Sequence, residues 1–540
     1  MIRDLANPGH DAAEIFDDAD VCVVGAGIAG ITIAARLRNR GLRVVILESG
    51  GRDHDEPAQA LNEVEITGHP YKGASQGRTR GLGGNSTIWG GALLPFTPTD
   101  FMSDEKDQSA TWPINFADLE PYIDDVEKMF GLPSGPYEAS NELNTTFLRR
   151  EAKWPSFANR NLALVHKEKL RDDPGLVTWL NATVTNLVLS NERDKIVAVK
   201  AKALNGTSLH VSAKHTIIAA GAIESTRLLL LFDKANDNRL DHLSATLGRY
   251  FHDHLSLPLG RIETDRPSAL NHFAGFRFEK GSMRSLRFEF NNRKQRHHSL
   301  RSGFVHIAFR PLEESGFDHV RSFLQSIQKG RPNLAAGLRC AGDLPYLAKA
   351  IYWRFGHRQL LWPQPSEYNI HVVAEQAPHQ DNRILLNTQL DAFGQRMASI
   401  DWHVREEDAK TFQTLALAFD RFWSTYHASL GGIIWNVAPK NIGPEHLRDV
   451  DDIYHPGGST RMANHASHGV VDKNCGVFGL SGISIVSTSV FPTGGTANPT
   501  MTLVMIAMRV ADHLCEELKG HTAQTKPIVC FKHSSFRNDN

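Results

Sequence analysis

Cysteine is scarce in this sequence, and long apolar runs are absent. The 540 residues include five cysteines, an odd number scattered along the chain without CxxC spacing, which argues against a disulfide framework and against a zinc site. The first twenty residues are acidic and contain no apolar run. We therefore expect a loosely held arm there, with neither a signal peptide nor a transmembrane helix. These absences favour a cytoplasmic protein without a bound metal.

An excess of charge of either sign is also missing. The 59 lysines and arginines nearly balance 60 aspartates and glutamates, so nothing global suggests a nucleic-acid partner. The exception is the segment from about 277 to 358, in which sixteen basic residues stand against six acidic ones. Apolar residues recur there at helical spacing, including Val320 with Leu324 and Leu347 with Ile351, so we expect a basic helical insert. Such helices either contact an anionic membrane, substrate or carrier, or more simply pack on the catalytic domain.

A nucleotide-binding signal stands near the N-terminus. VCVVGAGIAG (21–30) predicts a buried strand, a glycine turn and a helix, and the next strand, RVVIL, ends at Glu48. In such a unit Gly25 forms the tight turn, Gly27 lets the backbone approach a pyrophosphate, and Gly30 allows close helix packing. Glu48 stands where an acidic residue binds the ribose hydroxyls of the adenosine half. By itself this unit leaves FAD and NAD as alternatives.

Later motifs indicate that the nucleotide-binding domain is discontinuous. The glycine-rich stretch RTRGLGGNSTIWGGALL (78–94) permits close backbone approach to a flat ring system. HTIIAAGAIESTRLLLL (215–231) predicts a second strand, turn and helix. Alternating strands at 367–376 and 397–404 suggest a separate sheet in an insert. The chain is longer than the roughly 250–300 residues at which a single core stops growing, so we expect a second domain.

The expected fold class is therefore α/β. One domain is a discontinuous, Rossmann-like nucleotide-binding unit made of residues 18–100, 160–255 and 441–516. The other is a substrate-binding domain with an antiparallel sheet and helices, made of residues 101–159 and 256–440.

Two polar motifs follow near the C-terminus, YHPGGSTRM around His455 and SVFPTGGTANPTMT around Asn498. Together with GAGIAG, GLGGNSTIWGG, TIIAAGAIESTRLLL and GRYFHDHLS, they resemble the glucose-methanol-choline (GMC) family of flavoprotein oxidoreductases over most of the chain. The resemblance implies FAD as the cofactor. The TIWGG form of the flavin loop and the asparagine of ANPT are similar to the branch that contains pyranose 2-oxidase and bacterial glycoside oxidoreductases. Some relatives bind flavin covalently through a histidine before that tryptophan; Ile88 stands there in this chain, so we expect non-covalent FAD.

The resemblance also implies the chemistry. Alcohol oxidation removes the hydroxyl proton and passes the hydrogen on carbon to the flavin as hydride. His455 is the expected base, since imidazole titrates near neutrality. Asn498 is expected to donate a hydrogen bond to the alcohol oxygen, the alternative being a cap for the helix that starts at Pro499. The residues expected to bind FAD are Gly25, Gly27, Ile28, Ala29, Gly30, Glu48, Ser49, Arg80, Gly83, Gly84, Asn85, Ser86, Trp89, Gly90, Gly91, Val184, Ala220, Gly221, Ser225, Asn498, Pro499 and Thr500.

Two other groups of polar residues are weaker candidates. His252, Asp253 and His254 suggest a metal site, but no third ligand follows at a metal-like spacing, so we expect a structural loop beside the flavin. Glu375 and Gln376 end an apolar strand, and by alternation one of the two is expected to line the substrate pocket.

These features predict an FAD-dependent oxidoreductase that oxidises a secondary hydroxyl of a sugar or glycoside, with an electron acceptor that the sequence leaves open. The substrate rests on the branch resemblance. One alternative is an enzyme for aliphatic, choline-like or sterol alcohols, which needs a more apolar or aromatic pocket. A second is a non-redox, lyase-type enzyme that leaves the flavin oxidised. A third is a flavin-bound scaffold that shows no turnover and tolerates the loss of His455.

Overall fold

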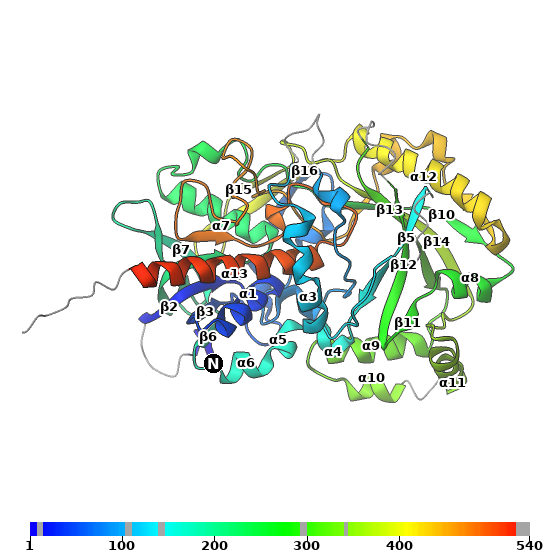
Figure 1. The fold of residues 1–540 in the computed structure, drawn as a ribbon, viewed down its shortest axis with the longest axis horizontal. Helices are drawn as coiled ribbons and strands as arrows, with labels where there is room; N and C mark the ends of the chain where they lie inside the picture. The colour runs from blue at the N-terminus through cyan, green and yellow to red at the C-terminus, as the bar shows by residue number, and fades with distance from the viewer. Residues whose placement is uncertain (8–13, 103–110, 139–145, 292–299, 340–343, 525–540) are drawn as a thin grey trace, which may run out of the picture.

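The computed structural model describes residues 1–7, 14–102, 111–138, 146–291, 300–339 and 344–524. Two halves lie side by side, each built on a large sheet (Figure 1). Among the described residues, no helix is long and apolar enough to cross a membrane.

The first half is built on an eight-stranded sheet. Strands that are buried on both faces need continuous apolar runs, and VCVV and VVIL supply them. The strand order is β1 (Ile2–Asp4), β6 (Leu176–Leu180), β3 (Val44–Leu47), β2 (Glu14–Val24), β9 (Ser208–Ile218), β8 (Ile196–Lys202) and β7 (Thr183–Leu189), with β19 (Ile483–Ile485) beside β9. The strands β1, β6, β3, β2, β9 and β19 are parallel, whereas β8 runs antiparallel to both of its neighbours, β7 and β9.

The prediction of a loosely held arm at the N-terminus is wrong. Residues 2–4 pair with β6, and β2 runs without a break from Glu14, with residues 14–19 paired to residues 208–213 of β9. A strand needs no apolar run when only its backbone is paired and its side chains alternate toward solvent. Residues 8–13 lie outside the described part.

Three longer helices and several short ones complete this half. α1 (Ile28–Asn39) follows β2, α7 (Ala222–Ala235) follows β9, and α13 (Thr500–Gln524) follows the second C-terminal motif. α13 lies along α1, where Arg36 and Asp512 form an ion pair of 2.6 Å (Figure 1). The shorter helices are α2 (Glu56–Ala60), α3 (Ile123–Met129), α4 (Phe157–Arg160), α5 (Leu162–Val165) and α6 (Lys167–Asp172).

The second half holds a largely antiparallel sheet. Its order is β11 (Arg277–Glu279), β12 (Ser282–Phe290), β13 (Gly303–Pro311), β14 (Ser366–Glu375), β10 (His254–Glu263) and β17 (Gly432–Trp435), with β5 (Phe147–Trp154) beside β12 and β18 (Asp451–Asp452) beside β10. α12 (Glu406–Tyr426) covers it with Phe412, Phe419 and Trp423, all buried, and α8 (Pro267–Ala274) lies at its end.

The two strands expected to share one sheet lie in different sheets. β14 belongs to the large sheet, whereas β16 (Arg396–Trp402) pairs with β15 (Arg383–Leu390) and with β4 (Val64–Gly68). Alternation identifies strands but does not say which strands pair, and β4 comes from a segment more than 300 residues earlier.

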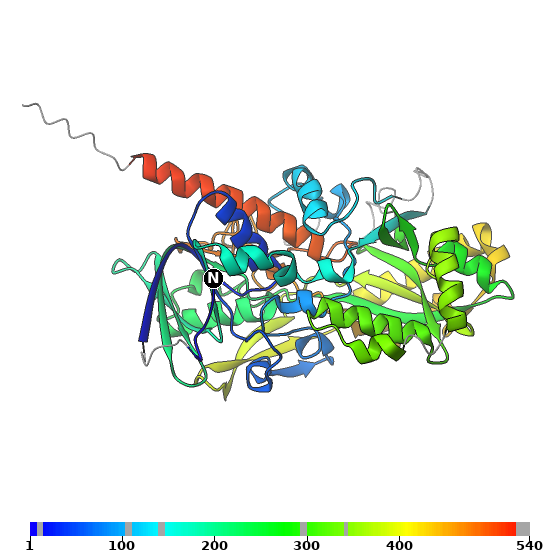
Figure 2. The ribbon, with the colours of Figure 1, turned by 90° about the horizontal axis from the view of Figure 1, so that it is seen from below.

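The basic insert is helical only in its second part. β11, β12 and β13 occupy its beginning, and the helices are α9 (Gly316–Gln328), α10 (Leu334–Arg339), α11 (Leu344–Tyr352) and a π-helical turn (Trp353–His357). The helical spacing in α9 and α11 is confirmed. Of the basic residues, Arg293, Lys294 and Arg296 lie outside the described part. Figures 1 and 2 show α9, α10 and α11 together along one edge of the molecule.

Candidate active site

A cavity of about 1320 Å³ runs between the two halves. Its lining begins at the ends of β2 and β3, passes His455 and Asn498, and continues to α9 and α11. Small-molecule sites usually occupy roughly 300–1,000 Å³, so this cavity has room for a dinucleotide and a second molecule.

The nucleotide end of the cavity is formed by backbone. Gly25 has φ +105°, and a Cβ there would lie 2.6 Å from the Ala219 oxygen, so a side chain is excluded. A Cβ on Gly30 would collide with the Gly25 oxygen, which confirms the close helix packing. Gly27 and Gly221 differ from Gly25 and Gly30, because a Cβ on either would meet nothing within 4 Å. Both line the cavity. Their missing side chains leave space for a ligand beside the main chain.

Three helices begin at this cavity. The first residues of α1 and α7, Thr500 at the start of α13 and Pro499 directly before it are among the lining residues. Helix N-termini present unpaired N–H groups and partial positive charge, which suits a pyrophosphate or an anionic ring. This donor set fits FAD, whose phosphates would lie at α1.

Glu48 is buried at the end of β3 and lines the cavity. Its carboxylate accepts backbone N–H bonds from Ala26 (2.8 Å), Gly50 (3.0 Å) and Gly81 (2.9 Å). The pKa of this carboxyl is raised above its ordinary value, because the effect of burial exceeds the opposing effect of the three hydrogen bonds. Glu48 therefore ties the first glycine turn to the flavin loop and is held where a ribose would reach it.

Most of the other residues expected to bind FAD line the cavity, and four do not. Gly30 and Ser225 lie inside the helices α1 and α7, and Gly83 and Ser86 shape the flavin loop. The Ser86 hydroxyl accepts a bond from the Leu162 N–H (3.1 Å), so these residues support the site from behind. The loop is also held from the other half, since the Gln328 amide donates to the oxygens of Ser86 and Trp89.

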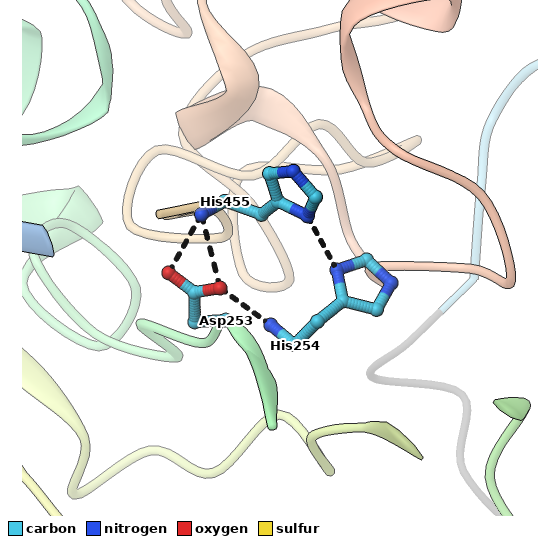
Figure 3. A group of neighbouring side chains, drawn as sticks. All are labelled: Asp253, His254 and His455. Atoms are coloured by element: carbon cyan, nitrogen blue, oxygen red, sulfur yellow. Dashed lines mark hydrogen bonds between the residues drawn. The ribbon is translucent and has the colours of Figure 1, made fainter. Parts of the chain in front are cut away.

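His455 lies at the junction of the two halves, in a continuous line of hydrogen bonds. Its Nδ1 lies 3.3 Å from Nδ1 of His254 (Figure 3). Nε2 of His254 lies 2.8 Å from the Gly495 oxygen. A carbonyl only accepts, so Nε2 of His254 carries the proton and its Nδ1 accepts. Nδ1 of His455 must then donate, which leaves the lone pair of His455 on Nε2.

Asn498 continues this line on the other side. Its Oδ1 accepts a bond of 2.8 Å from the guanidinium of Arg287, which also donates to the Thr496 oxygen (2.9 Å). A guanidinium only donates, so the amide orientation of Asn498 is fixed and its Nδ2 points to Nε2 of His455 at 3.4 Å. Both polar atoms of Asn498 are thus engaged away from α13, which disfavours the helix-cap alternative.

Burial sets the protonation of this group. It lowers the pKa of His455 well below its usual 6.5, and His254 and Arg287 lower it further. Burial likewise lowers the pKa of His254 to about 4 and that of Arg287 to about 10. At neutral pH both histidines are therefore neutral, as the directional line of hydrogen bonds requires.

Asp253 anchors the backbone of both histidines. Its carboxylate accepts bonds from the N–H groups of His254 (2.6 Å) and His455 (2.8 and 3.0 Å) (Figure 3). It also accepts a bond of 2.6 Å from the Tyr71 hydroxyl. Burial, with the nearby Asp452, raises its pKa to about 8.

The expectation that no third metal ligand accompanies the HDH stretch is corrected. His455, from a distant segment, lies beside Asp253 and His254 and could act as that ligand. The ligating atoms of Asp253, His254 and His455 lie within 4.8 Å of one another. Three donors, the N–H groups of His254 and His455 and the Tyr71 hydroxyl, already bond to Asp253, so we interpret the cluster as hydrogen-bonded. The absence of a bound metal stays a prediction.

Glu375 and Gln376 are not among the described residues that line the cavity. Gln376 is fully buried behind Asp253, where its Oε1 accepts bonds from the Asp253 N–H and the Trp402 indole. Glu375 pairs with His254 across β10 and β14 and accepts the Ser302 N–H. The pocket expectation for this pair is corrected, because the strand ends behind His254 and His455 rather than beside the cavity.

The outer wall of the cavity is apolar and aromatic, and the motifs gave no sign of it. The wall also contains four basic residues, Arg160, Arg321, Lys329 and Arg354. Among the described residues that line the cavity, the only acids are Glu48 and Glu224, at the nucleotide end. The apolar and aromatic residues of the wall are Trp154, Phe157, Phe276, Phe278, Met283, Phe317, Val320, Leu324, Leu347, Ile351, Leu360 and Trp362. Arg287 was also missed, since one arginine among sixteen basic residues carries no signal.

Comparison with known proteins agrees with this site. Residues 165–256 and 378–507 each match a profile described as GMC oxidoreductase, and residues 20–56 match one described as FAD dependent oxidoreductase. The chain belongs to the GMC oxidoreductase family. It is an FAD-dependent oxidoreductase that acts on alcohol groups. Its FAD is bound non-covalently, in keeping with Ile88 in the flavin loop.

Relatives of this GMC oxidoreductase act on different alcohols. It is 21% identical to a 2-methyl-1,2-propanediol dehydrogenase of Mycolicibacterium austroafricanum, over 92% of this chain and 95% of that protein. A 6'''-hydroxyparomomycin C oxidase of Streptomyces lividus is 24% identical (96% and 95% covered). The fructose dehydrogenase large subunit of Gluconobacter japonicus is 21% identical (93% and 98%).

A solved structure supports the fold. Pyridoxine 4-oxidase from Mesorbium loti superposes with a TM-score of 0.59 at 16% identity, over 92% of this chain and 98% of that one.

Proposed function

We propose that this GMC oxidoreductase oxidises an alcohol group on a bulky, largely apolar molecule that is neutral or anionic. The observation that carries the proposal is the outer wall of the cavity, whose apolar side chains favour an apolar body on the substrate by about 0.8 kcal/mol for each methylene buried. The wall's charged residues are all basic, so they disfavour a choline-like cation.

In this proposal His455 is the base. The substrate hydroxyl lies between Nε2 of His455 and Nδ2 of Asn498, and Nε2 takes its proton while the adjacent carbon–hydrogen bond breaks with its electron pair. Bound FAD supplies the acceptor for that hydride, so the alcohol becomes a carbonyl. Asn498 donates to the oxygen as it gains negative charge, and Arg287 polarises that amide.

His254 supports the protonated state of His455. The imidazolium donates through Nδ1 to the lone pair of His254, whose other nitrogen remains bonded to Gly495. The lowered pKa of His455 keeps this base free to accept a proton at neutral pH. The same shift favours release of the proton from the imidazolium at neutral pH.

A secondary hydroxyl of a sugar or glycoside is the second candidate. It is supported by the resemblance of TIWGG and ANPT to the branch that contains pyranose 2-oxidase, and by the full-length similarity to a fructose dehydrogenase subunit. Its weakness is the small number of neutral polar side chains on the outer wall, since free sugars need several hydrogen-bond partners.

Anaerobic mixing with a panel of alcohols tests the proposal. The panel contains long-chain alcohols, a sterol, choline, a free hexose and an alkyl glycoside of that hexose, and the visible flavin band is followed. We expect bleaching by the apolar alcohols or the alkyl glycoside and none by choline. Bleaching by the free hexose alone would favour the second candidate, and a flavin that stays oxidised during turnover would favour the lyase-type alternative.

A further inference from the structure

The helices beyond the outer wall expose large apolar side chains to solvent. Among the described residues, α11 has no buried side chain and α10 has one, Ala336. Relative exposures there run from 58% for Ile351 to 77% for Leu338, and the exposed residues are Leu334, Leu338, Leu344, Ile351, Tyr352 and Phe355. Large apolar side chains concentrated in this way on exposed helices mark a candidate interaction site, because exposing them to water is unfavourable. We call α10, α11 and the turn Trp353–His357 the rim.

The rim is also basic. The rim and the residues next to it, from Lys329 to Arg358, contain six lysines and arginines and one acidic residue. Arg339, Lys349 and Arg358 are exposed beside the apolar side chains. Basic and apolar residues interleaved on short helices, with Tyr352 and Trp353 among them, have the composition of helices that lie in the interface of an anionic bilayer.

The rim is continuous with the substrate end of the cavity. α11 lines the cavity through Tyr346, Leu347, Ala350 and Ile351, and the same helix exposes Leu344 and Tyr352 to solvent. Figures 1 and 2 show α10 and α11 at an outer edge of the molecule, next to α9. Lipid seated on the rim would therefore contact the same helix that contacts the substrate.

We propose that the rim docks on an anionic membrane surface. Charge decides the occupant: the apolar patch alone suits a membrane or a second copy of this chain, but two basic rims facing each other across a twofold axis would repel. Anionic lipid headgroups attract Arg339, Lys349 and Arg358, while the apolar side chains enter the acyl boundary. The inference is independent of which alcohol the enzyme oxidises.

Co-sedimentation of the holoenzyme with vesicles tests the proposal without turnover. Vesicles of phosphatidylcholine with phosphatidylglycerol are compared with phosphatidylcholine alone, at low and high salt. We expect binding to the anionic vesicles that weakens at high salt. Arg339→Glu with Lys349→Glu should weaken it at least about tenfold, and Leu338→Glu with Phe355→Glu should abolish it.

Matched controls separate docking from a loss of folding. Phe16→Glu changes an equally exposed aromatic residue, 72% against 76% for Phe355, on β2, and Lys202→Glu reverses an exposed charge on β8. Both controls should bind vesicles like the wild type, and all variants should keep FAD and their melting temperature. A wild type that stays in the supernatant, equal binding by all variants, or a salt-independent affinity for neutral vesicles would overturn the proposal. Self-association that the rim variants abolish would also overturn it, because the rim would then join two copies.

Discussion

At its nucleotide end the cavity is made of backbone, whereas at its outer end it is made of side chains. Gly27 and Gly221 present bare main chain beside three helix N-termini. Adding even a Cβ at either glycine would take up space that the cofactor needs. The outer wall is an assembly of apolar side chains from β5, β12, α9 and α11, any one of which can be exchanged at modest cost. The difference indicates that the chemistry and the choice of substrate are built separately, with His455 and Asn498 at the boundary.

The largest effect is expected at the backbone end. Gly27→Val places a side chain in the space that the phosphates of FAD need, while the backbone conformation, φ −85° and ψ −164°, suits any residue. We expect a folded protein that is isolated largely without FAD, as measured by the visible spectrum and by circular dichroism. Gly432→Val is the matched control, because its added side chain also meets nothing within 4 Å but lies at an exposed strand. Normal FAD content in Gly27→Val would refute the assignment of this turn.

His455→Ala is expected to slow flavin reduction by about 10²–10⁴-fold with FAD still bound, since it removes the base. The rate comes from anaerobic stopped-flow mixing with any alcohol that bleaches the wild type. His468→Ala, at an exposed histidine outside the cavity lining, should behave like the wild type. Near wild-type reduction by His455→Ala would assign the base elsewhere.

Arg287→Met is expected to slow reduction by about 10–100-fold, the magnitude of a lost hydrogen bond to a charged group. Without Arg287 the Asn498 amide is free to rotate, so its donor no longer faces the alcohol oxygen. Arg287→Lys keeps the charge and should recover part of the rate. Because a buried arginine also contributes to stability, melting temperatures accompany the rates, and an unchanged rate in a folded Arg287→Met protein contradicts the orienting role.

A change in the wall should act on binding rather than on the chemical step. Leu324→Ser is expected to raise KM for an apolar alcohol by about tenfold while kcat and FAD content stay near wild type, as loss of uniform apolar binding requires. Steady-state kinetics with one apolar and one small alcohol checks this. An equal effect on both alcohols would contradict the role of the wall in selection.

The smallest effect concerns the pH dependence of flavin reduction, namely the pH at which the rate begins to fall on the acidic side. The base must be unprotonated, and the pKa of His455 lies well below 6.5. Protonation of His455 should therefore leave the rate of flavin reduction unchanged down to pH 6.5 and lower it only at more acidic pH. Stopped-flow reduction across this range measures it. An inflection near pH 6.5 would mean that His455 is not held in the neutral state described, whereas an inflection near pH 8 would report Asp253.

The same contrast explains what the sequence could predict. The glycine turns, Glu48, His455 and Asn498 stand in short motifs, because backbone approach and proton transfer need particular residues at fixed spacing. Strand pairing over long separations carries no such signal, so the sheet of β16 with β4 and the end of β14 behind His254 were not predicted. The wall was missed for a related reason: Phe278, Leu324 and Trp362 are ordinary apolar residues until the fold brings them to one cavity.

The central claim is that a fixed catalytic group serves a cavity that selects its substrate by apolar contact. The most direct measurement is anaerobic flavin reduction by a series of alcohols that carry the same hydroxyl group on progressively longer alkyl chains. The account predicts that the efficiency of reduction rises by about threefold to fourfold for each methylene until the wall is covered. An efficiency that stays flat or falls with chain length would contradict it.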